Sequence, residues 1–163
     1  MLNRNFDEWI AKFRKSISTY DYYINFDKVV KNVEEKRVEL NILNSLMGSK
    51  NIEKDFAAII ERYHETLSCI PLLLAVRSNE IYAQDEDGAF LYNFKNINHS
   101  AEEYKIFMRK TGLFDMIANH IVNNLVDYAL GIETGLDSNG RKNRGGHLME
   151  DLVEKYIKFA GYK

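Results

Sequence analysis

Most of the chain shows the spacing of amphipathic helices. Apolar residues recur every three or four positions, so each run would line one face of a helix. The runs predict helices over residues 6–17, 29–46, 52–63, 67–76, 101–111 and 114–131, with a final helix from about residue 146 to residue 160. The sequence therefore predicts a mainly α fold, with the helices forming a compact multi-helix domain.

Glycine and polar residues mark the ends of several of these helices. Gly48 follows one apolar run and suits the left-handed conformation that often ends a helix. Ser100 and Glu103 have the spacing of a capping box, in which each side chain binds the main-chain N–H of the other residue. Residues 81–83 and 89–92 flank a turn that contains Gly88, which indicates a small β-hairpin.

Length and composition indicate an ordinary globular chain. Its 163 residues are 45% hydrophobic and 28% charged, which excludes a disordered or collagen-like protein. The net charge of −2 excludes a global attraction to nucleic acid or to an anionic membrane. No apolar run approaches the roughly 20 residues of a membrane helix, so we expect a cytoplasmic protein with no membrane partner. The single cysteine, Cys69, fits a reducing compartment, and we expect it to be buried and unreactive.

One segment departs from the helical pattern. Residues 131–146 contain five glycines and three cations, Arg141, Lys142 and Arg144. This composition predicts a loop whose exposed N–H groups and cations bind phosphate, beside the N-terminus of the final helix. A solvated loop without a ligand is an equally good interpretation. The same change in composition divides the chain into a helical domain, residues 1–130, and a second part, residues 131–163.

Other catalytic and binding motifs are absent or incomplete. The four histidines are not spaced as pairs of metal ligands on one helix face. Residues 135–142 are close to a P-loop, but Arg141 stands at the lysine position and Asn143 replaces the hydroxyl residue. We therefore expect neither a nucleotide cofactor nor a histidine metal site. Glu150, early in the final helix, either complements the helix dipole or positions a divalent metal.

Longer motifs resemble a known family. Residues 123–128, 135–144 and 149–150 resemble type II restriction endonucleases of the DpnII/MboI group, which cleave GATC. Further stretches agree and extend the resemblance along the whole chain, namely residues 4–9, 31–33, 40–52 and 71–75. The resemblance implies a Mg²⁺-dependent phosphodiesterase that restricts foreign DNA, acts on double-stranded DNA containing GATC and usually works as a homodimer.

The resemblance also implies roles for particular residues. Those that match the family's loop into the nuclease core, with contact to the DNA backbone implied, are Asn139, Arg141, Lys142, Asn143 and Arg144. Glu150 matches an accessory catalytic and metal-site residue on the first helix of the PD-(D/E)xK nuclease core. In the longer family members the main carboxylates of that core come after this helix. We therefore expect this chain alone to be inactive and to bind Mg²⁺ weakly at most.

Two similar motifs do not form that core. Residues 34–36 and 103–105 match Glu-x-Lys, but both lie in helical patterns, where residues two positions apart face different sides. The expected role of the helical part is contact with the duplex, dimerisation, or both. A non-catalytic helical module for protein interaction and an inactive gene remnant fit the same sequence, and no residue is assigned to base readout.

Overall fold

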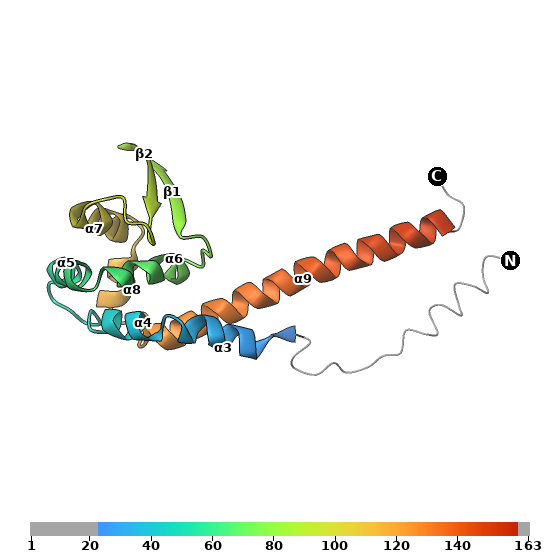
Figure 1. Cartoon of the computed structure of the whole chain (residues 1–163), viewed down its shortest axis with the longest axis horizontal. Helices are drawn as coiled ribbons and strands as arrows, with labels where there is room; N and C mark the ends of the chain where they lie inside the picture. Colours follow the sequence, from blue (N-terminus) through green and yellow to red (C-terminus); the bar gives the residue numbers. More distant parts are fainter. Residues whose placement is uncertain (1–22, 160–163) are drawn as a thin grey trace. The chain divides into compact units, whose positions relative to one another are not determined.

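A computed structural model describes residues 23–159 of the chain (Figure 1), so the helix predicted over residues 6–17 lies outside the described residues. The described part is mainly helical with one β-hairpin, as the sequence predicts. Its elements in chain order are α3 (Phe26–Glu34), α4 (Arg37–Asn44), α5 (Ile52–Arg62), the 3₁₀ helix η1 (His64–Cys69), α6 (Ile70–Leu73), β1 (Glu80–Asp85), β2 (Gly88–Asn93), α7 (Ala101–Lys110), α8 (Leu113–Ala118) and α9 (Leu125–Phe159).

The chain divides into two compact units. One contains residues 27–135, and the other contains residues 1–26 together with residues 136–163. The boundary at residue 130, expected from composition, stays a prediction. Between residues 23 and 159, no helix combines the length and the apolar character that a membrane crossing requires.

The unit of residues 27–135 has a single apolar core. The helices bury most of the apolar positions that periodicity predicts, for example Leu40 and Leu43 on α4 and Phe56 and Ile60 on α5. Val30 and Ile121 belong to the predicted stripes but are exposed. The Phe56 and Phe114 rings meet edge to face, with their centroids 5.3 Å apart. The other fully buried large residues of this core include Leu46, Leu67, Ile70, Leu73, Phe94, Tyr104, Met108, Ile117 and Leu125.

The β-hairpin is confirmed and lies beside α7 (Figure 1). Its antiparallel register runs without a bulge from the pair Glu80–Asn93 to the pair Asp85–Gly88. Gly88 has a φ of +131°, so the turn requires the glycine that the sequence supplies. Tyr92 anchors the hairpin to α7, because its ring lies 4.8 Å from that of Phe107.

The capping box at the start of α7 is also confirmed. The Glu103 N–H donates to Ser100 Oγ at 3.3 Å, and the Ser100 N–H donates to Glu103 Oε2 at 2.8 Å. The second of these bonds stabilises the carboxylate, so the Ser100 N–H holds the pKa of Glu103 below its usual value. Gly48 has a φ of +66° after α4, the left-handed conformation expected of it.

The boundaries of three predicted helices differ from the structure. The segment predicted as one helix over residues 67–76 is the 3₁₀ helix η1 up to Cys69, followed by the short α6, which ends at Leu73. A turn at residues 35–36 separates α3 from α4, where the pattern predicts one helix. The helix predicted over residues 114–131 is interrupted after α8, and His120 adopts a φ of +52° in the break. Asn124 then caps α9 by accepting the Val126 N–H at 2.8 Å.

The prediction of a glycine-rich loop at residues 131–146 is wrong, because this segment lies inside α9. The final helix does not begin near Gly146 but at Leu125. Glycine costs a helix about 1 kcal/mol relative to alanine, yet packing offsets this cost. Ala129, Glu133 and Asp137, spaced by four residues, are all buried, so one face of the segment is held by tertiary contacts.

Alanine at Gly131 or Gly135 is expected to stabilise the protein by about 0.5–1 kcal/mol, because a helical glycine loses more backbone freedom on folding. A Cβ at either position would meet nothing within 4 Å. Urea unfolding followed by circular dichroism measures the change. Gly48→Ala is the control and should destabilise, because its φ is +66° and its Cβ would lie 2.6 Å from His120 Nε2. Loss of stability in both helical variants would contradict the helix.

Candidate functional site

Helix α9 carries every residue to which the sequence assigned a DNA or metal role. Lys142 and Asn143 follow Asn139 by three and four residues, and Glu150 follows Asn143 by seven, which places all four on one face of the helix. All four are exposed. The structure therefore brings two amides, one cation and one carboxylate to a single accessible surface, which we call the α9 polar face.

The other two predicted residues lie elsewhere on the helix. Arg141 is partly buried on a different face, and Arg144 lies in α9 with its side chain outside the described atoms. A helix bonds its interior N–H groups to its own carbonyls. The expected phosphate cradle of loop N–H groups is therefore not formed, although a role for these side chains in DNA contact stays a prediction.

Glu150 pairs with a neighbouring residue of its own helix. Its Oε2 lies 3.4 Å from Nδ1 of His147, and both side chains are about 80% exposed. Along the helix axis, Glu150 is about 12 Å from Lys142, so the two do not converge on one phosphate. Among the residues described, no three carboxylate, histidine or cysteine side chains are grouped to hold a metal. The described residues thus do not fit the Mg²⁺ that the family resemblance implies.

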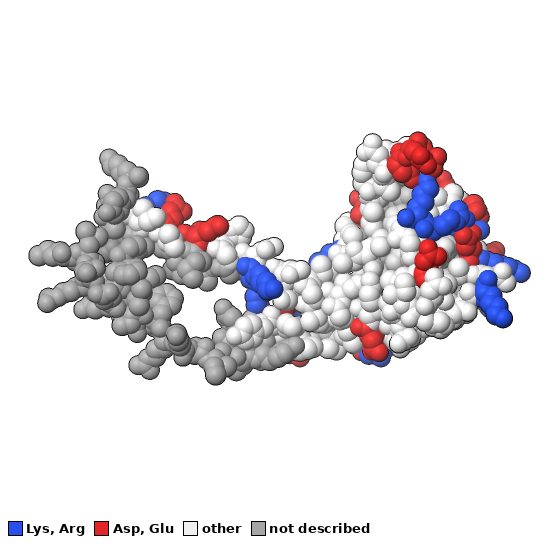
Figure 2. All heavy atoms as spheres, turned by 180° about the vertical axis from the view of Figure 1, so that it is seen from behind, with Lys and Arg blue, Asp and Glu red and all other residues white. Residues whose placement is uncertain are grey.

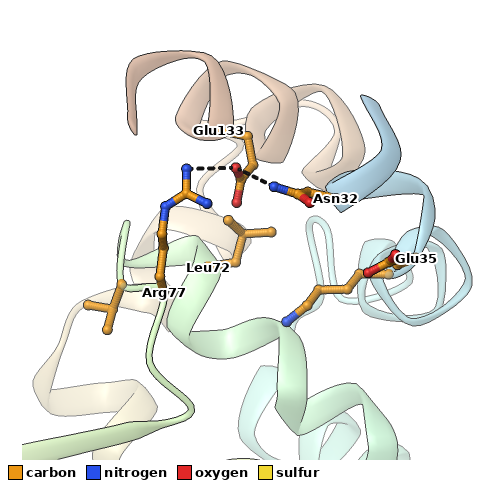
Figure 3. A pocket seen from close by; sticks show the side chains of 7 residues that line it. Asn32, Glu35, Leu72, Arg77 and Glu133 are labelled. Atoms are coloured by element: carbon orange, nitrogen blue, oxygen red, sulfur yellow. Dashed lines mark hydrogen bonds and ion pairs between the residues drawn. The ribbon is translucent and has the colours of Figure 1, made fainter. Parts of the chain in front are cut away.

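A buried carboxylate fixes the start of α9 (Figure 3). Glu133 is only 5% exposed, and its Oε2 accepts a hydrogen bond from Asn32 Nδ2 of α3 at 3.2 Å. The Arg77 guanidinium, from the segment after α6, lies 3.2 Å from the same oxygen. Figure 3 shows the two side chains reaching the carboxylate from opposite sides. We call this group the Glu133 clamp; it joins three segments that are far apart in the sequence.

The clamp borders a small pocket of about 220 Å³, lined also by Lys36, Glu35 and Leu72. Lys36 Nζ donates to the Ser68 carbonyl at 2.7 Å and so ties the turn before α4 to η1. The lining carries two carboxylates and two cations, of which Arg77 and Glu133 are paired, and it contains no histidine, thiol or hydroxyl. Its arrangement therefore suits the positioning of helices better than acid–base or nucleophilic catalysis.

The thiol of Cys69 is inert, as the sequence predicts. The side chain is fully buried beside η1, and burial raises the pKa of the Cys69 thiol to about 12. Because only the thiolate is nucleophilic, this cysteine cannot serve as a nucleophile at neutral pH.

Sequence reasoning missed Glu133 and a second buried carboxylate, Asp137. Asp137 is 5% exposed, and its Oδ2 accepts the Asn25 N–H at 2.9 Å. Both carboxylates occur in phase with Ala129, a buried position of the same helix. A helical reading of residues 125–137 would have placed them on its buried face, but the glycine count favoured a loop.

Charges over the hairpin end are mixed in sign. Figure 2 shows acidic and basic side chains lying next to one another there. Lys110 reaches Asp85 at 2.6 Å and also contacts Asp87, and these contacts raise the pKa of Lys110 above its usual range. This end of the unit therefore presents no continuous basic surface to a phosphate backbone.

Comparisons with known proteins match nearly the whole chain to one family. The model of a family described as DpnII restriction endonuclease matches residues 5–163. The chain is 47% identical to the type II restriction enzyme DpnII of Streptococcus pneumoniae, over 98% of the chain and 56% of that protein. It is 37% identical to the type II restriction enzyme MjaIII of Methanocaldococcus jannaschii, over 94% of the chain and 54% of that protein. For the type II restriction enzyme MboI of Moraxella bovis the identity is 34%, over 91% of the chain and 53% of that protein.

The chain thus spans about half the length of these curated relatives. No solved structure matches it.

Removing the cation of the Glu133 clamp is expected to destabilise the protein. Arg77→Ala leaves a buried carboxylate without its guanidinium, and we expect a loss of about 1–3 kcal/mol in the free energy of unfolding. This range lies below that of a fully buried pair because the Arg77 side chain is 46% exposed. Denaturant unfolding measures the loss.

A second substitution separates charge from packing. Adding Glu133→Gln to Arg77→Ala should recover part of the loss, because a neutral amide needs no counter-charge. Arg109→Ala is the matched control, since Arg109 pairs with Glu53 at the surface, and it should cost much less. Equal losses in Arg77→Ala and Arg109→Ala would contradict the clamp.

Proposed function

Because the chain belongs to the DpnII restriction endonuclease family, we propose that it is the N-terminal part of a type II restriction endonuclease that cleaves double-stranded DNA at GATC. The observation that carries this proposal is the family match over residues 5–163. The names of the relatives support the reaction class, since each of the three is a type II restriction enzyme. The GATC site rests on the likeness to the DpnII/MboI group.

Within such an enzyme, the α9 polar face is our candidate for contact with the DNA backbone. Lys142 offers an ammonium group to a phosphate, and the Asn139 and Asn143 amides can donate hydrogen bonds beside it. All three side chains are exposed on one face, so they can approach a duplex together. The Glu133 clamp holds the first turns of the same helix against α3.

Catalysis, in this proposal, needs more carboxylates than the described residues group together. Glu150 offers one exposed carboxylate, already paired with His147. Hydrolysis of a phosphodiester by Mg²⁺ requires carboxylates that fix the metal and a group that orients water. We assign Glu150 an accessory role, next to metal-binding carboxylates from the other half of the enzyme.

Binding of this chain to DNA is expected to be sensitive to salt. Fluorescence anisotropy with a short GATC duplex and a scrambled duplex, at low and physiological salt, measures it. Lys142→Ala should weaken binding to both duplexes alike and lower the slope of log affinity against log salt by about 0.9, the value for one phosphate contact.

The matched control removes the same charge from the opposite face of α9. Lys155 is exposed, and we expect Lys155→Ala to bind like the unchanged protein. Equal effects of the two substitutions would remove the α9 polar face from the proposal. No binding at either salt concentration would instead favour a protein-interaction module.

Cleavage by this chain alone is not expected. Incubation of the purified chain with a GATC duplex and Mg²⁺ should leave the duplex intact on a denaturing gel, because the described residues provide no carboxylate cluster for the metal. Product formed specifically at GATC would overturn the assignment of catalysis to the other half. Product that persists in Glu150→Ala would also remove the role given to Glu150.

A further inference from the structure

The outer edge of β2 is closed by side chains of the loop that follows it. The Leu91 carbonyl accepts hydrogen bonds from Asn98 Nδ2 at 2.8 Å and from His99 Nε2 at 2.9 Å. The Asn93 N–H donates to Asn98 Oδ1 at 2.8 Å, and the Asn93 carbonyl accepts from the Tyr104 hydroxyl. No further strand can therefore pair with β2 at these positions without displacing those contacts.

The outer edge of β1 is open. The Phe94 N–H donates to the Asn79 carbonyl at 2.8 Å, which makes these two residues a hydrogen-bonded pair. Along the antiparallel register, hydrogen-bonded and non-hydrogen-bonded pairs alternate, so the main-chain groups of Glu80, Tyr82 and Gln84 point away from β2. The Glu80 N–H donates to Ser78 Oγ. Within the part of the chain described, the outward groups of Tyr82 and Gln84 have no hydrogen-bond partner.

Three common protections of an edge strand are missing from β1. Proteins block such edges with proline, lysine or a bulge. None of these occurs between Glu80 and Asp85, and the pairing with β2 is regular along all six residues of the strand. Instead, Tyr82 is 65% exposed beside its cross-strand neighbour Leu91, which is 47% exposed. An open edge flanked by exposed apolar side chains is a template for another strand.

We propose that β1 pairs antiparallel with β1 of a second copy of this chain, so that the two hairpins form one continuous four-stranded sheet. The proposal deepens the proposed function by naming the surface through which two copies associate. It rests on that function only for the relevance of a dimer, which the family resemblance implies.

One register pairs the strand with itself without conflict. When Tyr82 lies opposite Tyr82 of the second copy, Glu80 lies opposite Gln84, and every outward-facing residue of β1 has a partner. A shift by one pair in one direction sets Glu80 opposite Glu86, where like charges repel. The opposite shift leaves Gln84 opposite Ser78, beyond the start of the strand. The sequence of β1 therefore favours a two-fold axis at Tyr82.

The same register adds apolar contact on the side of the sheet that faces α7. A hollow of about 640 Å³ lies there, with a lining that includes Ala83, Phe90 and Phe107. Ile81 of the second copy would lie beside Ala83 and over this hollow. On the opposite side of the sheet, the Tyr82 rings of the two copies come together. Edge hydrogen bonds, an aromatic pair and a filled hollow thus act at one surface.

Chemical cross-linking tests the two-fold axis. Residues that face each other in a hydrogen-bonded antiparallel pair have Cα atoms about 5.5 Å apart, so Tyr82→Cys chains should be joined as dimers by a short bismaleimide. Val38→Cys is the control, because Val38 is similarly exposed on α4 and should give monomer. The native Cys69 is fully buried and does not compete. The proposal would be overturned if both variants gave equal amounts of cross-linked dimer, or if Tyr82→Cys gave none.

A matched pair of proline variants tests the edge itself. Gln84→Pro removes an N–H that points out of β1, whereas Ala89→Pro, directly opposite, removes one that points out of β2. Neither change removes a bond between the two strands. By sedimentation velocity, the unchanged chain and Ala89→Pro should dimerise, and Gln84→Pro should be largely monomeric while keeping its helical circular dichroism.

A monomeric unchanged chain, or equal dimerisation of the two proline variants, would overturn the interface. Anisotropy with the GATC duplex, measured on the same samples, separates this result from the proposed function. A chain that binds the duplex as a monomer refutes the β1 interface alone, whereas loss of DNA binding with an intact dimer counts against the proposed function.

Discussion

The buried carboxylate of Glu133 is the constraint on which the arrangement around α9 depends. A carboxylate inside a protein requires a cation and hydrogen-bond donors, because its desolvation is otherwise too costly. Here the Arg77 guanidinium and the Asn32 amide meet that need from two separate segments. Their positions in turn fix the rotation of the first turns of α9, which belong to the same unit.

The sequence predicted the local features that short-range chemistry controls. The capping box at Ser100, the hairpin turn at Gly88 and the buried stripes of α4 and α5 all follow from spacing and turn chemistry, and the structure contains them. The boundaries between helices were harder to predict. Apolar periodicity continues across the turn at residues 35–36, so it could not reveal the break between α3 and α4.

The sequence predicted the wrong conformation for the segment that carries the candidate site residues. Glycine content normally favours a loop, and the cost of each helical glycine is real. Tertiary packing decided otherwise, because Ala129, Glu133 and Asp137 are buried on one side of the segment. Two of these three residues are charged, so a search for apolar periodicity does not identify them as buried. The roles of Asn139 and Lys142 in DNA contact follow from family resemblance and stay a prediction.

A helix and a glycine-rich loop offer different chemical groups to the phosphates of DNA. A glycine-rich loop grips phosphate with main-chain N–H groups, whereas an interior helical segment offers only its side chains. Contact through α9 would therefore depend on Lys142 and its amide neighbours, with a reach set by the helix rise of about 1.5 Å per residue. Such a surface grips the backbone at a few points and leaves sequence reading to other residues.

The two outer edges of the hairpin differ in how far side chains cover their main-chain groups. Asn98, His99 and Tyr104 cover β2, while β1 keeps regular, unprotected main-chain groups beside exposed Tyr82. Selection against aggregation would close both edges if neither were used. A two-fold pairing of β1 also suits the proposed target, because GATC reads the same on both strands and a palindromic site is matched by a two-fold protein. The proposed β1 interface and the palindromic form of the proposed target are thus compatible with one two-fold assembly.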